Sequence, residues 1–245
     1  QQGYSGFVPN LMKEKFPEGK FLVKKTWNNI GVTTEIDPLD PLFKKIGTTF
    51  MKNQQKIFGT YGFYACDPFH EGEPPVEGVQ YLNDVGRTIS ELYESFDKNY
   101  TWVMQAWSIR KDIVMAVPKE HLLILDLDCQ FPVAHDGYWG YKYVVGRLHN
   151  FGARMSSLHG DMHLAAEGGF NKAKQYAPAA CGTGLFMEGI GQNPAFYDLS
   201  LEMLTRSDSV DLDEWTKGYI ERRYGVTGKD AEPAVKAWKL LTDHM

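Results

Sequence analysis

Short apolar runs rich in strand-forming residues recur along this chain and alternate with helical patterns. The runs lie at 59–66, 102–107, 122–127, 142–148 and 181–187. They lack a regular polar alternation, which is typical of strands buried on both faces. Between them, apolar residues recur at spacings of three and four, most clearly over 79–98. Strands that alternate with helices predict a parallel sheet with crossover helices, either in a barrel or in an open doubly wound sheet.

Polar side chains gather at the carboxyl end of each expected strand. They are Asp67, His70 and Glu71, then Gln105 and Trp107, Asp126 and Asp128, His149 and Asn150, and Glu188 and Gln192. A (β/α)8 barrel builds its site from many strand ends, whereas an open sheet concentrates ligand groups at one switch point. The pattern therefore predicts an α/β fold with a TIM-type (β/α)8 barrel. Five strands and a candidate stub at 3–7 are too few to close it, so we expect an incomplete barrel without its first strands.

The last stretch of the chain changes to a purely helical pattern. Trp215, Tyr219 and Ile220 recur at helical spacing, a break follows at 225–229, and a second helical pattern begins near Val235. A length of 245 residues is enough for one main unit and an appendage. We therefore divide the chain into a partial catalytic barrel at 1–206 and the beginning of a C-terminal α-helical domain at 207–245.

Charge and hydropathy exclude two classes of partner. The formal net charge is -5 and the basic residues are scattered, so no basic stripe could follow a nucleic-acid backbone. No run of about 18 apolar residues occurs, so we expect no membrane span. Because the chain begins at Gln1 with no signal-like run, we expect a mature product or an excised piece. The sequence leaves open whether the chain forms a homo-oligomer.

The sequence predicts neither a metal site nor a cofactor site. Cys66, Cys129 and Cys181 are far apart and odd in number, which argues against a disulfide framework and a CxxC zinc site. We expect all three to be buried thiols. His159 and His163 are four positions apart, but the stretch HGDMH lacks the glutamate of an HExxH motif.

Two glutamates each follow an expected strand and precede a glycine. Glu71 lies in CDPFHEGEPP, where the proline pair prevents a helix, and Glu188 lies in GTGLFMEGIGQN. Glycoside hydrolysis requires two such acids, one to protonate the departing oxygen and one to act as nucleophile or base across the sugar ring. One glutamate alone would be interpreted as a surface carboxylate. The pair, with aromatic residues nearby, favours a sugar site.

The aromatic residues near these strand ends are suited to carbohydrate. They include Trp27, Trp102, Trp107, Trp139, Tyr61, Tyr64, Tyr138 and Phe151. Aromatic rings stack on the apolar faces of sugars, and neighbouring polar groups bind the hydroxyls. Most aromatic residues of a globular chain belong to the core, so we expect about two of the tryptophans to line a pocket.

Five blocks of the chain resemble one known family, in the same order. They are YGFYACDPFHEGEPP, WVMQAW, LLILDLD, LHNFG and GTGLFMEGIGQNPAFYDL. They are similar to the catalytic barrel of the α-N-acetylglucosaminidases, the family 89 glycoside hydrolases. The resemblance runs from about Gly3 to the end, where DEWTKGYIERRYGV resembles the start of that family's helical C-terminal domain.

The resemblance implies an exo-acting, retaining hydrolase that releases terminal α-linked N-acetylglucosamine from heparan-sulfate-like or mucin-type glycans by double displacement. By position, Glu71 matches the general acid/base and Glu188 the nucleophile. The positions that match residues around the sugar pocket are Trp27, His70, Trp107 and Asn150. A secretory route is also implied, with a secreted, periplasmic or lysosomal location. The family's N-terminal domain and first strands are not in this chain, so activity of these 245 residues alone stays open.

The chain departs from the family pattern at three places. His70 stands where animal homologues usually carry Asn. Cys129 stands where many relatives carry a further acid, and Arg154 with Met155 stands where animal forms read Asn-His. These departures bear on pocket detail and leaving-group preference. Two other functions stay open: a noncatalytic carbohydrate-binding barrel, which does not need both acids, and a barrel hydrolase for β-linked sugars, which also pairs two glutamates.

Overall fold

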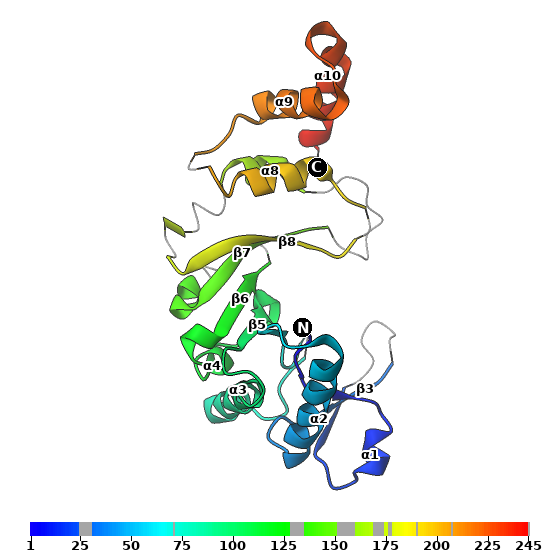
Figure 1. Cartoon of the computed structure of the whole chain (residues 1–245), viewed down its shortest axis with the longest axis vertical. Coiled ribbons are helices and arrows are strands. Elements are labelled where there is room, and N and C mark those ends of the chain that lie inside the picture. Colours follow the sequence, from blue (N-terminus) through cyan, green and yellow to red (C-terminus); the bar gives the residue numbers. More distant parts are fainter. Residues whose placement is uncertain are drawn as a thin grey trace. The chain divides into compact units, whose positions relative to one another are not determined.

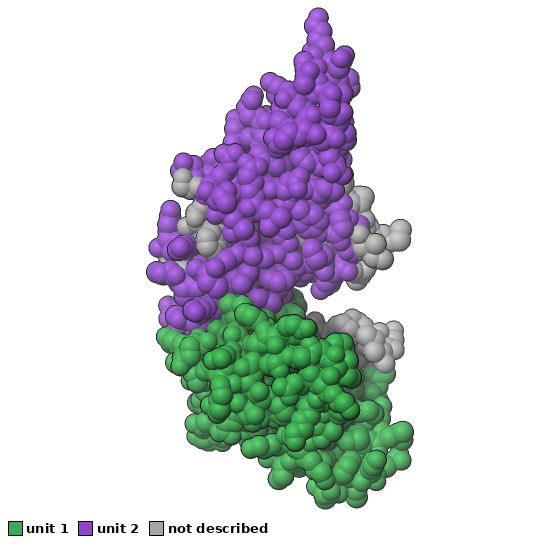
Figure 2. Space-filling model, in the orientation of Figure 1, with its two compact units in different colours: residues 1–124 green, residues 125–245 purple. Residues whose placement is uncertain are grey.

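The computed structural model describes most of the chain as two compact units. The described residues are 1–24, 31–70, 72–127, 135–150, 160–168, 174–175, 178–189, 191–206 and 208–244. The units are Gln1–Ile124 and Leu125–Met245, shown in green and purple in Figure 2. No helix within the described ranges is long and apolar enough to cross a membrane.

The first unit opens with a small antiparallel sheet. Its strands are β1 (Phe7–Val8), β2 (Phe21–Lys24) and β3 (Thr33–Ile36), in the order β1-β3-β2, with the short helix α1 (Met12–Lys15) after β1. We did not predict this sheet from the sequence. Strands of two and four residues are too short to produce the apolar runs on which the strand predictions rest.

The long helix α2 (Pro41–Phe58) follows this sheet and was not predicted either. Its start has the usual signals, because Asp40 Oδ1 accepts a hydrogen bond from Leu42 N at 2.7 Å and a proline occupies the first turn. Phe43 and Met51 lie on its buried face. The helix leads directly into the first strand of the main sheet.

Strands β4 (Phe63–Ala65) and β5 (Thr101–Gln105) form a parallel pair, joined by helix α3 (Val79–Glu94). The strand predicted at 59–66 is present but shorter. The beginning of the chain runs along β4, where Gln2 forms an isolated parallel bridge with Ala65. The strand stub predicted at 3–7 is therefore a single bridge, and the two residues of β1 belong to the antiparallel sheet instead.

The predicted apolar face of α3 packs into the core of the first unit. Val85 and Ile89 are fully buried. Gly86 faces helix α4 (Lys111–Val114), since a Cβ built on Gly86 would lie 2.5 Å from the carbonyl oxygen of Ile113. The two helices therefore approach more closely than a side chain would allow. Two short 3-10 turns, η1 (Ala106–Ser108) and η2 (Lys119–His121), complete the segment after β5.

The remaining strands continue the main sheet in chain order. They are β6 (Leu122–Asp126), β7 (Lys142–Asn150) and β8 (Ala180–Met187), the green and yellow arrows of Figure 1. The sheet order is β4-β5-β6-β7-β8. β7 and β8 pair in parallel. Gly146 of β7 has no space for a side chain, because a Cβ would collide with the Asp126 carbonyl oxygen and the Phe186 ring. The five strands predicted from apolar runs are all present.

The second unit carries its own helical core. Its helices are α6 (Met162–Ala166), α8 (Pro194–Glu202), α9 (Leu212–Tyr224) and α10 (Glu232–Thr242), with the 3-10 turns η3 (Asp136–Gly140) and η4 (Gly228–Ala231). Phe196 and Leu199 of α8 share a buried cluster with Trp215 and Trp238 of the last two helices. The two helices predicted after 211 are thus confirmed, and they pack on the helix that follows β8.

One of the cysteine predictions is wrong. Cys66 is buried, and burial raises the pKa of its thiol to about 12. Cys181, by contrast, is exposed. It lies near the start of β8, at an irregularity where the register with β7 shifts between Tyr143 and Val144. Cys129 lies outside the described residues.

Candidate active site

The carboxyl end of β4 is fixed by an aspartate. Asp67 Oδ1 accepts a hydrogen bond from the backbone N–H of Gln105, at the end of β5, at 2.7 Å. Burial raises the pKa of Asp67 above its ordinary value, and this hydrogen bond and the nearby His70 partly oppose the rise. The two neighbouring strand ends are therefore joined directly beyond the last pair of the ladder.

The turn that follows Asp67 carries the first predicted acid. Phe69 adopts a positive φ of 56°, an uncommon conformation for a non-glycine residue, and its ring is buried. The ring packs 6.3 Å from that of Tyr81, between centroids, and Gly72 N donates to Phe69 O at 2.9 Å. His70 is half-buried, and its Nδ1 is buried with no hydrogen-bond partner among the described residues. Glu71 itself lies outside the described residues.

Trp107 lies on η1, just past the end of β5, and over half of its side-chain surface is exposed. An exposed indole at a strand end is available for stacking on a ligand. Trp102, Tyr64 and Tyr138 are instead buried in the core. Trp27 lies outside the described residues.

The second predicted acid follows β8. Glu188 is exposed, directly after Met187, the last residue of the strand. The next residues are held locally, since Gln192 Nε2 donates to Gly189 O at 2.7 Å. Asn193 is fully buried and caps α8, its Oδ1 accepting hydrogen bonds from the N–H groups of the following turn at 3.1 and 3.3 Å.

Asn150 ends β7 beside this position. Its backbone pairs with Met187 in the parallel register, after an irregularity between Leu148 and Asn150. The structure therefore brings Asn150 and Glu188 to the ends of adjacent strands. In the same way, His70 follows β4 and Trp107 follows β5, and these two strands are also paired. Four of the six predicted site residues thus belong to two pairs of neighbouring strand ends.

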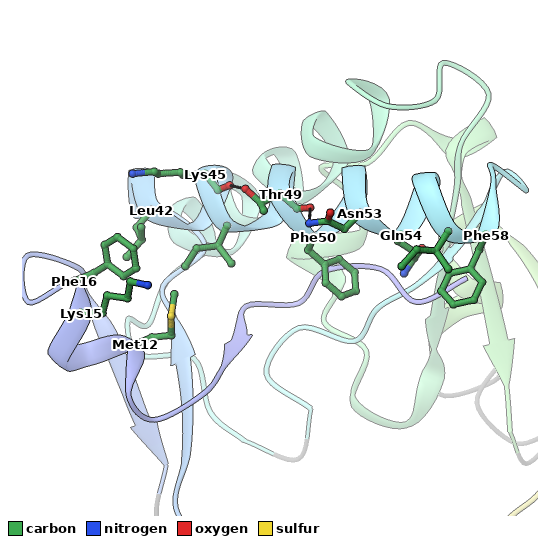
Figure 3. A pocket seen from close by; sticks show the side chains of 12 residues that line it. Met12, Lys15, Phe16, Leu42, Lys45, Thr49, Phe50, Asn53, Gln54 and Phe58 are labelled. Carbon is green, nitrogen blue, oxygen red and sulfur yellow. Dashed lines mark hydrogen bonds between the residues drawn. The ribbon is translucent and has the colours of Figure 1, made fainter.

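Other surface features of the described residues lie away from the strand ends. A hollow of about 590 Å³ lies along α2 and is lined mostly by apolar side chains, including Phe16, Phe50 and Phe58 (Figure 3). No residue from the carboxyl end of a strand lines it. Among the described residues, no group of three or more His, Cys, Asp or Glu side chains could hold a metal ion. His163 is exposed, 3.8 Å from Asp243, and His159 lies outside the described residues.

Comparison with known proteins decides the family. The family model for the TIM-barrel domain of α-N-acetylglucosaminidase (NAGLU) matches residues 1–207. The chain belongs to the α-N-acetylglucosaminidase family. Its main sheet is therefore an incomplete (β/α)8 barrel, as the sequence predicts.

Individual relatives agree with this assignment. The human α-N-acetylglucosaminidase is 30% identical over 258 residues, which cover 97% of this chain and 34% of the human protein. A family 89 glycoside hydrolase from Clostridium perfringens, solved with 2-acetamido-1,2-dideoxynojirimycin, superimposes with a TM-score of 0.85 at 27% identity. A complex of the C. perfringens protein with GlcNAc-α-1,4-galactose gives 0.86 at the same identity. The match covers 99% of this chain and 28% of each bacterial chain, so this chain spans about a third of its relatives' length.

Two residues that matter at the strand ends were not singled out from the sequence. Asn193 could have been found, because an asparagine before a proline is a recognisable helix start. Arg110 could not, because its hydrogen bond reaches Gly72, 38 positions away. Nothing in its local sequence indicates this contact.

Proposed function

We propose that the protein to which this chain belongs is an exo-acting, retaining glycoside hydrolase that releases terminal α-linked N-acetylglucosamine. One observation carries the proposal. The C. perfringens relative in complex with GlcNAc-α-1,4-galactose carries two Glu-to-Gln substitutions 118 positions apart. Glu71 and Glu188 are 117 positions apart and follow the first and last strands of the main sheet. An intact substrate in a complex is expected when both the proton donor and the nucleophile have been disabled.

The proposed reaction has two displacement steps. In the first, a Glu188 carboxylate oxygen forms a bond to the anomeric carbon, the glycosidic bond breaks, and Glu71 gives its proton to the departing oxygen. In the second, Glu71 takes a proton from water, whose oxygen bonds to the anomeric carbon and releases Glu188. Two inversions leave the product with the α configuration of the substrate. Glu188 is exposed at its strand end, as a nucleophile reached by a ligand must be.

The other predicted residues would bind the sugar. Trp107 offers an exposed ring for stacking, and Asn150 follows the strand next to Glu188. His70 directly precedes Glu71 and presents a buried Nδ1. Trp27 is included on the family pattern alone. Heparan-sulfate-like and mucin-type glycans are the proposed substrates, and a secretory route the proposed location. Residues 207–245 are proposed to begin the helical C-terminal domain.

The test uses the full-length parent protein with two substrates of the same sugar. One is an aryl α-N-acetylglucosaminide with a good leaving group, and the other is GlcNAc-α-1,4-galactose, whose leaving group needs a proton. Glu188→Ala is expected to lower kcat/KM on both by at least about 10⁴-fold, because the nucleophile is lost. Glu71→Gln is expected to lower kcat/KM on the disaccharide by about 10²–10⁴-fold and to spare the aryl substrate largely.

Four results would contradict the proposal. If Glu71→Gln lowers kcat/KM equally on both substrates, Glu71 is not the general acid. No turnover by the parent protein would favour a noncatalytic carbohydrate-binding barrel, and turnover of β-linked substrates would favour the other class of barrel hydrolase. An NMR spectrum recorded early in the reaction should show the α anomer of N-acetylglucosamine first, and a β anomer would contradict retention.

A further inference from the structure

The loop after β4 runs beside the segment after β5 in the same register as the two strands. Within the strands, Tyr64 pairs with Trp102. Beyond them, Asp67 accepts from Gln105 N and Gly72 O accepts from Arg110, both across 38 positions. The separation of 38 positions between partners in the two strands is thus the same in both loop contacts. The second contact lies one residue past Glu71.

The contact from Arg110 is short, and most of the side chain is shielded from water. Its Nη2 donates to the Gly72 carbonyl oxygen at 2.7 Å. The Arg110 side chain is 25% exposed, and its Nε is buried with no hydrogen-bond partner among the described residues. A charge-assisted hydrogen bond in such surroundings is stronger and better defined than a solvent-exposed one.

The backbone of Arg110 is itself held by tertiary packing. Arg110 precedes α4, and its carbonyl oxygen accepts from Ile113 N and Val114 N, both at 3.1 Å. Both of these residues are buried. Helix α4 packs closely on α3 at Gly86, where a side chain would not fit. The guanidinium therefore extends from a fixed point.

The residues on either side of Glu71 in the sequence make these contacts. On one side, Phe69 is anchored by its buried ring and accepts a hydrogen bond from Gly72 N. On the other, Arg110 holds the Gly72 carbonyl oxygen. Both the N–H and the carbonyl oxygen of Gly72, the residue after Glu71, thus form a hydrogen bond. A proton donor needs this kind of support, because a displacement of about 1 Å can cost about 10²-fold in rate.

The second contact of Arg110 is weaker. Its Nη2 lies 3.4 Å from Glu73 Oε2, and the Glu73 side chain is 89% exposed. An ion pair this exposed contributes little to stability. The carbonyl contact and the ion pair can therefore be separated by substitution.

We propose that Arg110 is a positioning residue, which holds the Gly72 carbonyl and so fixes the loop that presents Glu71 as the general acid. This proposal rests on the role of Glu71 proposed above. Arg110 does not touch the reacting atoms. Its effect should therefore depend on how much the leaving group needs a proton.

The experiment compares Arg110→Gln, Arg110→Lys and Glu73→Gln in the full-length parent protein, on the two substrates named above. Arg110→Gln is expected to lower kcat/KM on GlcNAc-α-1,4-galactose by about 10- to 100-fold and on the aryl substrate by less than about threefold. Lysine keeps one charged donor without the flat guanidinium, so Arg110→Lys is expected to lose about 3- to 10-fold on the disaccharide. Glu73→Gln is the matched control and should stay within about twofold on both.

The outcomes separate this proposal from the one on which it rests. Equal loss on both substrates in Arg110→Gln and Arg110→Lys would indicate a merely structural role and overturn the proposal. So would unchanged activity of Arg110→Gln, or a loss in Glu73→Gln as large as that in Arg110→Gln. If Arg110→Gln fails to fold by circular dichroism, the leaving-group dependence of Arg110→Lys decides. Full disaccharide activity in Glu71→Gln would instead overturn the proposed function.

Discussion

The connections after β4 and after β8 each carry one of the two proposed catalytic glutamates, but they are held in different ways. After β4, Asp67 and Gly72 are joined to residues 38 positions away. After β8, the described contacts include two local ones, from Gln192 to Gly189 and from the Asn193 cap to the first turn of α8. The first connection depends on how a neighbouring unit of the barrel is packed. The second includes the capped start of its own helix.

This difference predicts sensitive positions in different helices. Disturbing the packing of α3 on α4 should reach the loop of Glu71 through Arg110. Disturbing the first turn of α8 should act on the cluster of Phe196 and Leu199 that anchors the helix after Glu188. Three substitutions test the comparison.

The largest effect is expected at Gly86. In Gly86→Ala the new Cβ would lie 2.5 Å from the Ile113 carbonyl oxygen and 3.0 Å from the Ala116 Cβ. We expect a loss of about 1–3 kcal/mol in the free energy of unfolding, although alanine is the better helix former. Urea denaturation of the full-length parent measures it. The loss should be accompanied by a larger fall in kcat/KM on the disaccharide than on the aryl substrate.

Gly218→Ala in α9 is the matched control. A Cβ at Gly218 meets the end of the flexible Arg222 side chain at 3.1 Å, so it can be accommodated. We expect a gain of about 0.5–1 kcal/mol from helix propensity alone. A gain in the free energy of unfolding of Gly86→Ala as well would show that α3 and α4 can move apart. It would contradict the proposed dependence of the connection after β4 on their packing.

An intermediate effect is expected at Asn193. Asn193→Ala removes the acceptor that caps α8 and leaves buried N–H groups without it, so we expect a loss of about 1–2 kcal/mol in the free energy of unfolding. Asn193→Asp keeps the acceptor and should recover most of the loss. Because the cap is local, kcat/KM should fall on both substrates alike. A loss confined to the disaccharide would contradict this.

The smallest effect is expected at Glu202, at the end of α8. The indole N–H of Trp215 donates to its Oε2 at 2.8 Å, and this bond and Arg206 hold the pKa of Glu202 below its usual range. A lowered folded-state pKa stabilises the fold above the ordinary glutamate pKa. That contribution is lost as the pH falls from the ordinary pKa through the lowered one.

Glu202→Gln should therefore lose about 0.5–1 kcal/mol near pH 7 and differ less from the parent in strong acid. Thermal unfolding followed between about pH 3 and pH 7 measures the difference. A difference in stability between Glu202→Gln and the parent that grows as the pH falls would contradict this prediction. Asp67, in the loop after β4, has the opposite shift, because there burial outweighs the hydrogen bond it accepts.

Much of the barrel could be predicted because buried parallel strands leave continuous apolar runs. The runs at 122–127 and 181–187 correspond closely to β6 and β8. The antiparallel sheet was missed because its strands are too short to produce such runs. Helix α2 was missed although Asp40 and Pro41 mark its start, so there a recognisable local signal went unused.

The site residues stay predictions, and they rest on local patterns. A glycine after an acid at a strand end is a local pattern, and it indicated both glutamates. The exposure of Trp107 and the burial of Trp102, only five positions earlier, depend on which side of the strand end faces the core. The contact of Arg110 depends on the register of two parallel strands, which no single stretch of sequence contains.

The register that β4 and β5 keep beyond their ends also sets where the chain tolerates a change of length. Inserting or deleting one residue between Asp67 and Gly72 would place every later residue opposite the wrong partner of the neighbouring loop. Residues 75–78, just beyond, are exposed, and the path to α3 can lengthen there without moving the tethered part. Natural variation in loop length and engineered insertions should therefore both fall after the proline pair and not before it.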